Sequence, residues 1–500
     1  MFTKLSTSAK GSLATYWSVL VVAAIAIAAL GFSAQAHGQI GQFETRSDKW
    51  GAIFQDQHRT WLKTQETDFR TKHMGSVKES GLDARPDMVI LWAGYAFSKD
   101  YSSPRGHMYA IDDMRVSLRT GTPVQDTDGP QPATCWSCKS FDVIRMMDQY
   151  SEGGTKDGAT EFFKKQWGAM GPEIVNPVGC GTCHNASDMS LQVKQPALID
   201  AFNRRGVDVS KEDNNHKRSL VCAQCHVEYF FKAPNRTLTF PWDKGFTMEN
   251  MEAYYDEAKY ADWTHAVSKA PMLKAQHPDY ELHMLGTHGM RGVSCADCHM
   301  PMSSNGKTSF SNHQISSPLR NIKESCQSCH ADRTEDELRK FVEFNQDKVL
   351  EIRDRVEPEL TKAHLMAKAA WDNGATEAEM APALQLIRQA QWRWDYGVAS
   401  HGASFHAPVE TQRILSMSLD KSYQAQIELQ KILTAHKVTF TMPDISTREK
   451  ASAYIGLDLT KLRAEKAEWV KTIVPQWLEK AKAADRLDPN VPNTVVYPGK

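Results

Sequence analysis

Residues 135–139 read Cys-Trp-Ser-Cys-Lys, and this stretch opens a series of five cysteine pairs that decides the fold. In each later pair the second cysteine is followed at once by histidine. The four later motifs are Cys180-Gly-Thr-Cys183-His184, Cys222-Ala-Gln-Cys225-His226, Cys295-Ala-Asp-Cys298-His299 and Cys326-Gln-Ser-Cys329-His330. All ten cysteines of the 500-residue chain belong to these pairs, so no cysteine is left to pair at long range. A disulfide framework does not require that regularity.

The Cys-x-x-Cys-His spacing is the attachment signature of c-type haem. Each thiol adds to a vinyl group of the porphyrin, and the adjacent histidine becomes the proximal ligand of the iron. Zinc sites need two cysteine pairs per metal and no histidine fixed at the next position. Four such motifs in one chain therefore predict covalently bound haems rather than zinc ions or disulfides.

Lysine replaces histidine in the first motif, where Cys135 and Cys138 are followed by Lys139. One interpretation is a structural cysteine pair that has lost its haem. The other is a fifth haem with Lys139 as proximal ligand, since the iron's charge and burial favour loss of the amine's proton. We favour the fifth haem, because the spacing keeps a nitrogen donor immediately after the second cysteine.

Distal ligands must come from the remaining histidines. A haem that only carries electrons usually has both axial positions filled, whereas a catalytic haem keeps one open for substrate. The chain has 18 histidines, and spacing alone does not choose among those outside the motifs. We expect packing or surface roles for His216, His364 and His436. Better candidates lie in or beside the cysteine region or in a His-Ala-Pro turn, namely His107, His288, His313 and His406.

The first 36 residues resemble an export signal. Two lysines precede an apolar run over residues 19–30, and Ala34-Gln-Ala36 is a small-x-small cleavage site. The apolar run is shorter than the roughly 20 residues that span a bilayer, which favours a cleaved signal peptide over an anchor helix. Export by this signal predicts a periplasmic protein. The net charge of -1 shows no basic excess of the kind that nucleic-acid binding needs.

The fold class expected is mainly α, a multihaem cytochrome c fold with little β structure. We divide the chain into a signal peptide (1–36), a haem-binding catalytic domain (37–331) and a long-helix region (332–500). The long-helix region is expected to act as scaffold and dimer interface and to supply one distal ligand, His406. Upstream, residues 49–70 have helical character.

Four helices are predicted in the C-terminal region. The first has an apolar face made of Phe341, Phe344, Val349, Ile352, Val356 and Leu360. A capping box, Thr376 followed by Glu379, starts the second. The third covers about 410–437, and a last one begins at Ser446 and Glu449.

The motif series resembles the pentahaem, ammonia-forming cytochrome c nitrite reductases. The resemblance covers nearly the whole chain after the signal, including Lys-Ala-Gln-His-Pro (274–278), Gln-Trp-Arg-Trp-Asp (391–395) and the closing helices. It implies reduction of nitrite to ammonium, five covalently bound haem c groups and one calcium ion per chain. It also implies a homodimer, with a membrane quinol-oxidising or soluble multihaem cytochrome c as electron donor.

The resemblance implies roles for individual residues. Its catalytic haem would be the one on Cys135, Cys138 and Lys139, with Arg119, Tyr229 and His277 on the open face. Arg115 lies one helical turn before Arg119, and the Leu-Arg-Thr-Gly context selects Arg119. The distal histidines would pair as His107 with His226, His313 with His184, His406 with His299 and His288 with His330. Calcium would be bound by the Glu228 carboxylate, the carbonyls of Tyr229 and Lys274, and the side-chain oxygen of Gln276.

In this interpretation Arg119 and a protonated His277 attract and hold the nitrite anion, and His277 donates protons. Three alternatives remain at this level. The chain could be an electron carrier with five saturated haems, a reductase of hydroxylamine or sulfite, or a zinc or disulfide scaffold. The first of these leaves the Lys139 replacement without a purpose.

Overall fold

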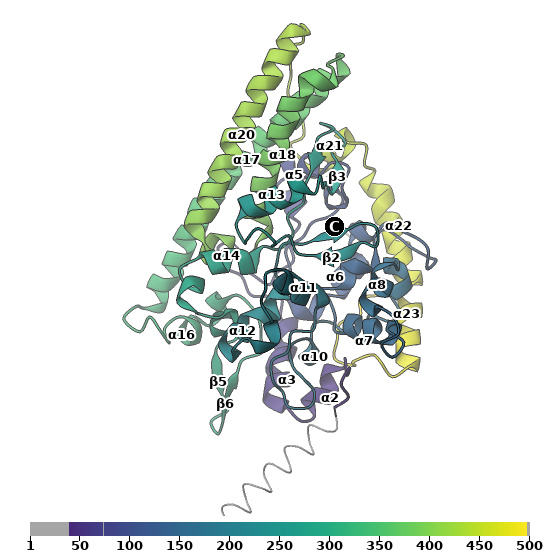
Figure 1. Ribbon diagram of the computed structural model, residues 1–500, viewed down its shortest axis with the longest axis vertical. Coiled ribbons are helices and arrows are strands. Elements are labelled where there is room, and N and C mark those ends of the chain that lie inside the picture. The colour runs from purple at the N-terminus through teal and green to yellow at the C-terminus, as the bar shows by residue number, and fades with distance from the viewer. Residues whose placement is uncertain (1–39, 74, 498–500) are drawn as a thin grey trace, which may run out of the picture.

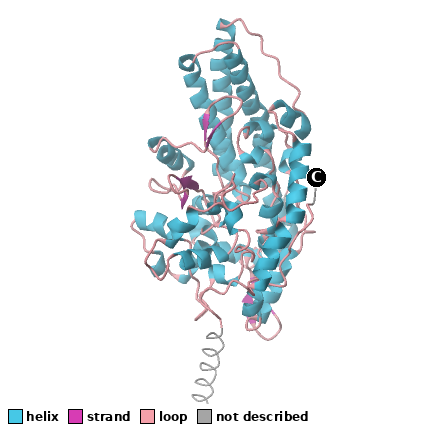
Figure 2. Ribbon diagram, turned by 90° about the vertical axis from the view of Figure 1, so that its right-hand side faces the viewer, coloured by secondary structure: helices cyan, strands magenta, loops and turns pink. Residues whose placement is uncertain are grey.

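The computed structural model describes residues 40–73 and 75–497, and the predicted signal peptide lies outside them. Helices and loops make up nearly all of the described chain, which confirms the expected mainly α class (Figure 2). The strands found in this part form three antiparallel two-stranded hairpins. They are β1 (Phe230–Lys232) with β2 (Thr237–Thr239), β3 (Trp263–Thr264) with β4 (Pro271–Met272), and β5 (Met302–Ser304) with β6 (Ser309–Ser311).

Short helices joined by loops make up most of the described chain before residue 335, including the half of the molecule that carries the cysteine pairs. Those before the first pair are α2 (Ser47–Gly51), α3 (Gln55–Leu62), α4 (Gly81–Ala84), α5 (Asp87–Leu91) and α6 (Asp112–Val116). Those after it are α7 (Asp142–Tyr150), α8 (Gly158–Phe163), α9 (Trp167–Met170), α10 (Cys180–Cys183), α11 (Pro196–Arg204), α12 (Asn214–Ala223), α13 (Met248–Glu257), α14 (Asp279–Leu285), α15 (Cys295–His299) and α16 (Ile322–Ser325). Single 3-10 turns lie between them: η1 (Lys63–Gln65), η2 (Ala96–Ser98), η3 (His107–Tyr109), η4 (Leu118–Thr120), η5 (Ala133–Trp136), η6 (Val209–Lys211), η7 (Gly289–Arg291) and η8 (Pro318–Arg320).

Three long helices rise side by side from this half: α17 (Glu335–Asp372), α18 (Glu377–Ala399) and α20 (Pro408–Ala435) (Figure 1). The capping box at Thr376 and Glu379 starts α18 as predicted. The predicted apolar face of α17 is only partly buried, because Phe341 and Phe344 are 60% and 57% exposed. The core shared with α18 and α20 begins on α17 at Val349, so the first turns of α17 extend beyond it.

The prediction of one last helix from Ser446 is wrong. Three helices stand there: α21 (Arg448–Tyr454), α22 (Leu459–Thr472) and α23 (Val474–Ala483). Thr447 caps α21 by accepting a hydrogen bond from Lys450 N, whereas the Ser446 hydroxyl donates to Asp444. Gly456, at φ +77°, follows α21, and Asp458 caps α22.

The last two helices pack against the segment that holds the first cysteine pair. Trp469 and Trp477, from α22 and α23, lie with ring centroids 5.9 and 5.6 Å from that of Trp167. Trp167 in turn stacks on Trp136 at 4.7 Å. The C-terminal helices therefore brace the surroundings of Cys135. Among residues 40–73 and 75–497, no helix is long and apolar enough to cross a membrane.

Candidate functional site

A single cavity of about 1390 Å³ lies among the short helices, and all ten cysteines line it. None of the ten forms a disulfide, although Cys138 and Cys225 lie within hydrogen-bonding reach of each other. The residue that follows each pair also lines the cavity: Lys139, His184, His226, His299 and His330. Motifs that span some 200 residues of sequence thus converge on one space.

Four pairs of imidazoles face each other across this cavity. Each pair joins a histidine of a cysteine motif to one of the four candidate distal histidines. The ring centroids are 6.2 Å apart in His107–His226, His184–His313 and His299–His406, and 6.3 Å apart in His288–His330. A metal–imidazole bond is about 2.0 Å long and the ring centre lies roughly 1 Å beyond the nitrogen, so one metal between two imidazoles separates the centres by about 6 Å. The spacing fits a haem iron between each pair.

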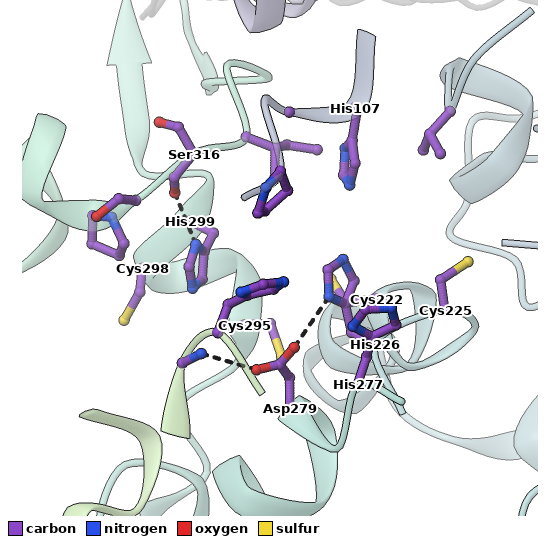
Figure 3. A pocket seen from close by; sticks show the side chains of 18 of the residues that line it. His107, Cys222, Cys225, His226, His277, Asp279, Cys295, Cys298, His299 and Ser316 are labelled. Carbon is purple, nitrogen blue, oxygen red and sulfur yellow. Dashed lines mark hydrogen bonds and ion pairs between the residues drawn. The ribbon is translucent and has the colours of Figure 1, made fainter. Parts of the chain in front are cut away.

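Three of the motif histidines have a polar partner at Nδ1. Nδ1 of His184 donates to the carbonyl of Met189, and Nδ1 of His299 donates to that of Ser316, both at 2.9 Å. Nδ1 of His226 lies 3.4 Å from the Asp279 carboxylate (Figure 3). A proton held on Nδ1 leaves the lone pair of Nε2 available to bind a metal, which is the usual arrangement of a metal-binding histidine.

Arg119 lines the same cavity as Lys139, Tyr229 and His277, whereas Arg115 does not. The Arg119 guanidinium lies 4.5 Å from the ring centroid of Phe97, and its Nε donates to Ser117 Oγ at 3.2 Å. Arg115 is fully buried away from the cavity, where its Nη2 donates to the Ile174 carbonyl at 3.4 Å. The structure therefore brings the predicted arginine, and not its neighbour one turn earlier, to the candidate catalytic site.

Tyr229 and His277 are partly buried side chains that line this site. Burial raises the pKa of Tyr229 well above its usual value, and the Cys138 and Cys135 thiols add to the effect, so the phenol keeps its proton. Burial, followed by the nearby Lys139, holds the pKa of His277 well below its usual value. The imidazole is therefore neutral at pH 7 in this structure, against the expectation of a protonated ring. That expectation used the pKa of a solvated histidine.

Three of the four residues predicted to bind calcium, Glu228, Lys274 and Gln276, lie in one hydrogen-bond network beside the cavity. Glu228 is fully buried, and its carboxylate accepts hydrogen bonds from Tyr255 Oη at 2.9 Å and from Gln276 N at 2.6 Å. The Gln276 amide reaches the Lys274 carbonyl at 3.2 Å. Burial raises the pKa of Glu228 well above its usual range, which a nearby cation would reverse. These hard oxygen donors fit a calcium ion.

No group of three or more His, Cys, Asp and Glu side chains is placed to hold a metal ion in the described ranges. A calcium site here would therefore depend on one carboxylate and several carbonyl or amide oxygens. The side chain of Lys274 points away from such a site, because its Nζ pairs with the buried Asp395 carboxylate at 2.8 Å.

The chain matches the family model described as cytochrome c552 over residues 46–486. It is 56% identical to a cytochrome c-552 of Bacteroides fragilis, with 90% of each chain covered, and 45% identical to one of Maridesulfovibrio salexigens, with 91% of this chain and 90% of the relative covered. The chain belongs to the cytochrome c552 family. As a member of this family, the chain carries covalently bound haem c.

A solved relative shares the fold of this cytochrome c552. The catalytic subunit of cytochrome c nitrite reductase from Desulfovibrio desulfuricans, a structure with two calcium sites, superimposes with a TM-score of 0.72 at 30% identity. The match covers 92% of this chain and all of the relative. The resemblance to the cytochrome c nitrite reductases, and with it the assignment to an oxidoreductase family, is confirmed.

Sequence reasoning missed two residues of this cytochrome's site. Asp279, at the start of α14, contacts His226 and also accepts hydrogen bonds from Ser400 and Gly402. His401 stacks beside His277, with ring centroids 6.0 Å apart. The Asp279–Ser400 and His277–His401 contacts each join residues more than 120 positions apart, so no local spacing could have indicated them.

Proposed function

We propose that this cytochrome reduces nitrite to ammonium, a six-electron, eight-proton reaction, at a haem bound by Cys135, Cys138 and Lys139. One observation carries the proposal: Lys139, Arg119, Tyr229 and His277 line one cavity together with four facing imidazole pairs. A haem on the first cysteine pair would supply a redox iron with one open axial position. Each of the four candidate distal histidines faces a histidine of another motif, which leaves none of them for Lys139 and suits a position kept for substrate.

Arg119 is the proposed nitrite-binding residue. Because its Nε donates to Ser117, its two Nη groups remain as the fork that binds the oxygens of the anion. The same positive charge stabilises the negative charge that grows on the departing oxygen as the N–O bond breaks. The stacking on Phe97 and the bond to Ser117 hold this fork in place before substrate arrives.

Tyr229 and His277 are the proposed proton-handling residues. The Tyr229 phenol, which keeps its proton, donates a hydrogen bond to substrate oxygen. Neutral His277 offers one N–H donor and one acceptor nitrogen, so it can pass a proton inward and be reprotonated from outside. Calcium bound by Glu228, the Tyr229 and Lys274 carbonyls and Gln276 would fix the loop that carries Tyr229.

Four further haems, each with two histidine ligands, are proposed as the electron store beside this site. Their ligands would be the four facing pairs, and the total would be five haem c groups and one calcium ion per chain. The large cavity, the free cysteines and the ring spacings support this count. Nitrite reduction needs such a store, because six electrons must reach one substrate.

We further propose that the protein is exported to the periplasm by its cleaved signal peptide and acts as a homodimer through the long helices. Its donor would be a membrane quinol-oxidising or soluble multihaem cytochrome c. The division at residue 331 stays a prediction. The signal pattern of residues 1–36 supports export. The exposed apolar side chains Phe344 on α17 and Val409, Tyr423 and Ile427 on α20 support a dimer interface on the long helices.

The test is product analysis with the haem-loaded protein and a chemical reductant. We expect one ammonium per nitrite and six electrons consumed, with hydroxylamine and sulfite reduced at lower kcat/KM than nitrite. A protein that is fully reduced by the donor yet forms no ammonium would be the electron carrier instead. A higher kcat/KM for hydroxylamine or sulfite would point to the related reductases.

A further inference from the structure

Asp279 lies between two imidazoles that belong to different pairs. One carboxylate oxygen is 3.4 Å from Nδ1 of His226 and the other is 3.9 Å from Nδ1 of His406. The residue is only 8% exposed. In Figure 3 its carboxylate points into the cavity towards His226, beside His277 and Cys222.

The hydrogen bonds around Asp279 identify it as an ionised carboxylate. It accepts from the Ser400 hydroxyl and from Gly402 N at 3.1 Å, in addition to His226. A carboxyl group surrounded by donors on both oxygens acts as acceptor only, which is the ionised form. Ser400 and Gly402 lie in the link from α18 to α19 (Ala403–His406), so this link positions both the carboxylate and His406.

The partner of His226 differs in charge from those of its counterparts. His184 and His299 donate through Nδ1 to neutral backbone carbonyls. A carboxylate acceptor makes imidazole a stronger donor to a metal, and stronger donation stabilises the oxidised iron. A haem held by His226 should therefore be harder to reduce than one held by His184 and His313, whose Nδ1 atoms both contact backbone carbonyls.

The haem held by His226 would lie between the Lys139 site and the next motif, so its reduction potential would affect electron transfer between them. The Cys225 thiol lies beside Cys138 of the Lys139 site, and the Cys222 thiol lies beside Cys295 of the next motif. The haem on Cys222 and Cys225 is thus the link between the Lys139 haem and the others. A low potential at this link favours transfer of its electron onward to the catalytic haem.

We propose that Asp279 is a positioning residue that lowers the reduction potential of the haem ligated by His226 and His107, and so directs electrons towards the Lys139 haem. The inference rests on the haem ligation in the proposed function and not on nitrite as the substrate.

The test is potentiometric titration of the haem-loaded protein without nitrite, followed by optical and electron paramagnetic resonance spectra. Asp279→Asn keeps the shape and one acceptor oxygen, replaces the other oxygen with an NH2 donor, and removes the charge. We expect the Fe(II)/Fe(III) ratio of one low-spin haem to rise at least tenfold at a fixed potential, which is about 59 mV for one electron. The matched control is Glu212→Gln, since Glu212 bonds Nδ1 of His216, a histidine outside the four pairs, at 2.7 Å. It should leave every potential unchanged.

A second variant should shift the reduction potential of the same haem in the opposite direction. Ser400→Ala removes a donor from Asp279, so the carboxylate interacts more strongly with His226 and the same haem becomes harder to reduce. A purely structural role would not produce opposite shifts. Titration curves of Asp279→Asn that overlay the wild type at equal haem content overturn the proposal. If Asp279→Asn fails to load haem, an unshifted Ser400→Ala overturns it. Potentials that shift in a protein inactive on nitrite would refute the proposed function while leaving this inference standing.

Discussion

Replacement of Arg119 tests the anion-binding half of the proposed chemistry. The guanidinium fork offers two Nη groups, and a hydrogen bond to a charged partner contributes about 1.5–3 kcal/mol. Arg119→Gln loses two such bonds and regains one neutral bond worth about 1 kcal/mol, a net loss of about 2–5 kcal/mol. That loss corresponds to roughly a 30- to 5000-fold decrease in kcat/KM for nitrite. Arg119→Lys keeps the charge without the fork, so its decrease should be smaller.

The assay is steady-state reduction of nitrite with ammonium as the measured product, on protein matched for haem content. An optical titration of nitrite binding separates affinity from turnover. The four imidazole pairs do not include Arg119, so the low-spin haem spectra should match those of the wild type. Equal kcat/KM in wild type, Arg119→Lys and Arg119→Gln would refute the assignment of Arg119 as the anion-binding residue.

Three further perturbations test the surroundings of the site. Lys466 is 1% exposed and donates to Thr120 Oγ1 at 2.9 Å and to the Gly121 carbonyl at 2.6 Å, directly after Arg119, the proposed nitrite-binding residue. Lys466→Met should therefore raise KM for nitrite about fivefold to tenfold through loss of two bonds. Burial lowers the pKa of Lys466 from 10.5 to about 7. Between pH 7 and 10.5 the unfolded chain therefore binds more protons than the folded chain, and the free energy of unfolding should rise with pH. Urea midpoints of Lys466→Met that rise equally with pH would contradict this dependence on Lys466. Tyr229→Phe should lower kcat about tenfold to a hundredfold with little change in KM, and an unchanged kcat would remove the phenol from proton delivery. A calcium chelator should abolish activity until calcium is restored, and Glu228→Gln should need more calcium for the same activity; indifference to the chelator would argue against a functional calcium site.

Much of the fold was predictable from local patterns. The cysteine spacing identified the haem-binding region, because covalent attachment imposes a strict local sequence. The capping box at Thr376 set the start of α18, since side chain and backbone bond within one turn. The start and the number of the last helices were harder to predict, because Ser446 and Thr447 are equally suitable caps and Gly456 alone does not reveal the end of a helix.

Features that depend on distant contacts escaped the sequence. A periodic apolar face does not say what covers it, so neither the position of Phe341 at the cavity wall nor the exposure of Phe344 was foreseen. The protonation of His277 depends on burial, which only the tertiary structure supplies. The role of Asp279 needs the link after α18 to meet α14. The predicted histidine pairs do face each other across the cavity, and ligation of iron by them stays a prediction.

The central claim is that one haem, on Cys135, Cys138 and Lys139, has an open position for nitrite. The most direct measurement is the electron paramagnetic resonance spectrum of the ferric haem-loaded protein with and without nitrite. The account predicts a high-spin signal, or a signal coupled to it, that changes when nitrite is added, while the low-spin signals of the bis-histidine haems persist. A spectrum in which every haem is low-spin and nitrite has no effect would contradict the claim and favour an electron-transfer cytochrome.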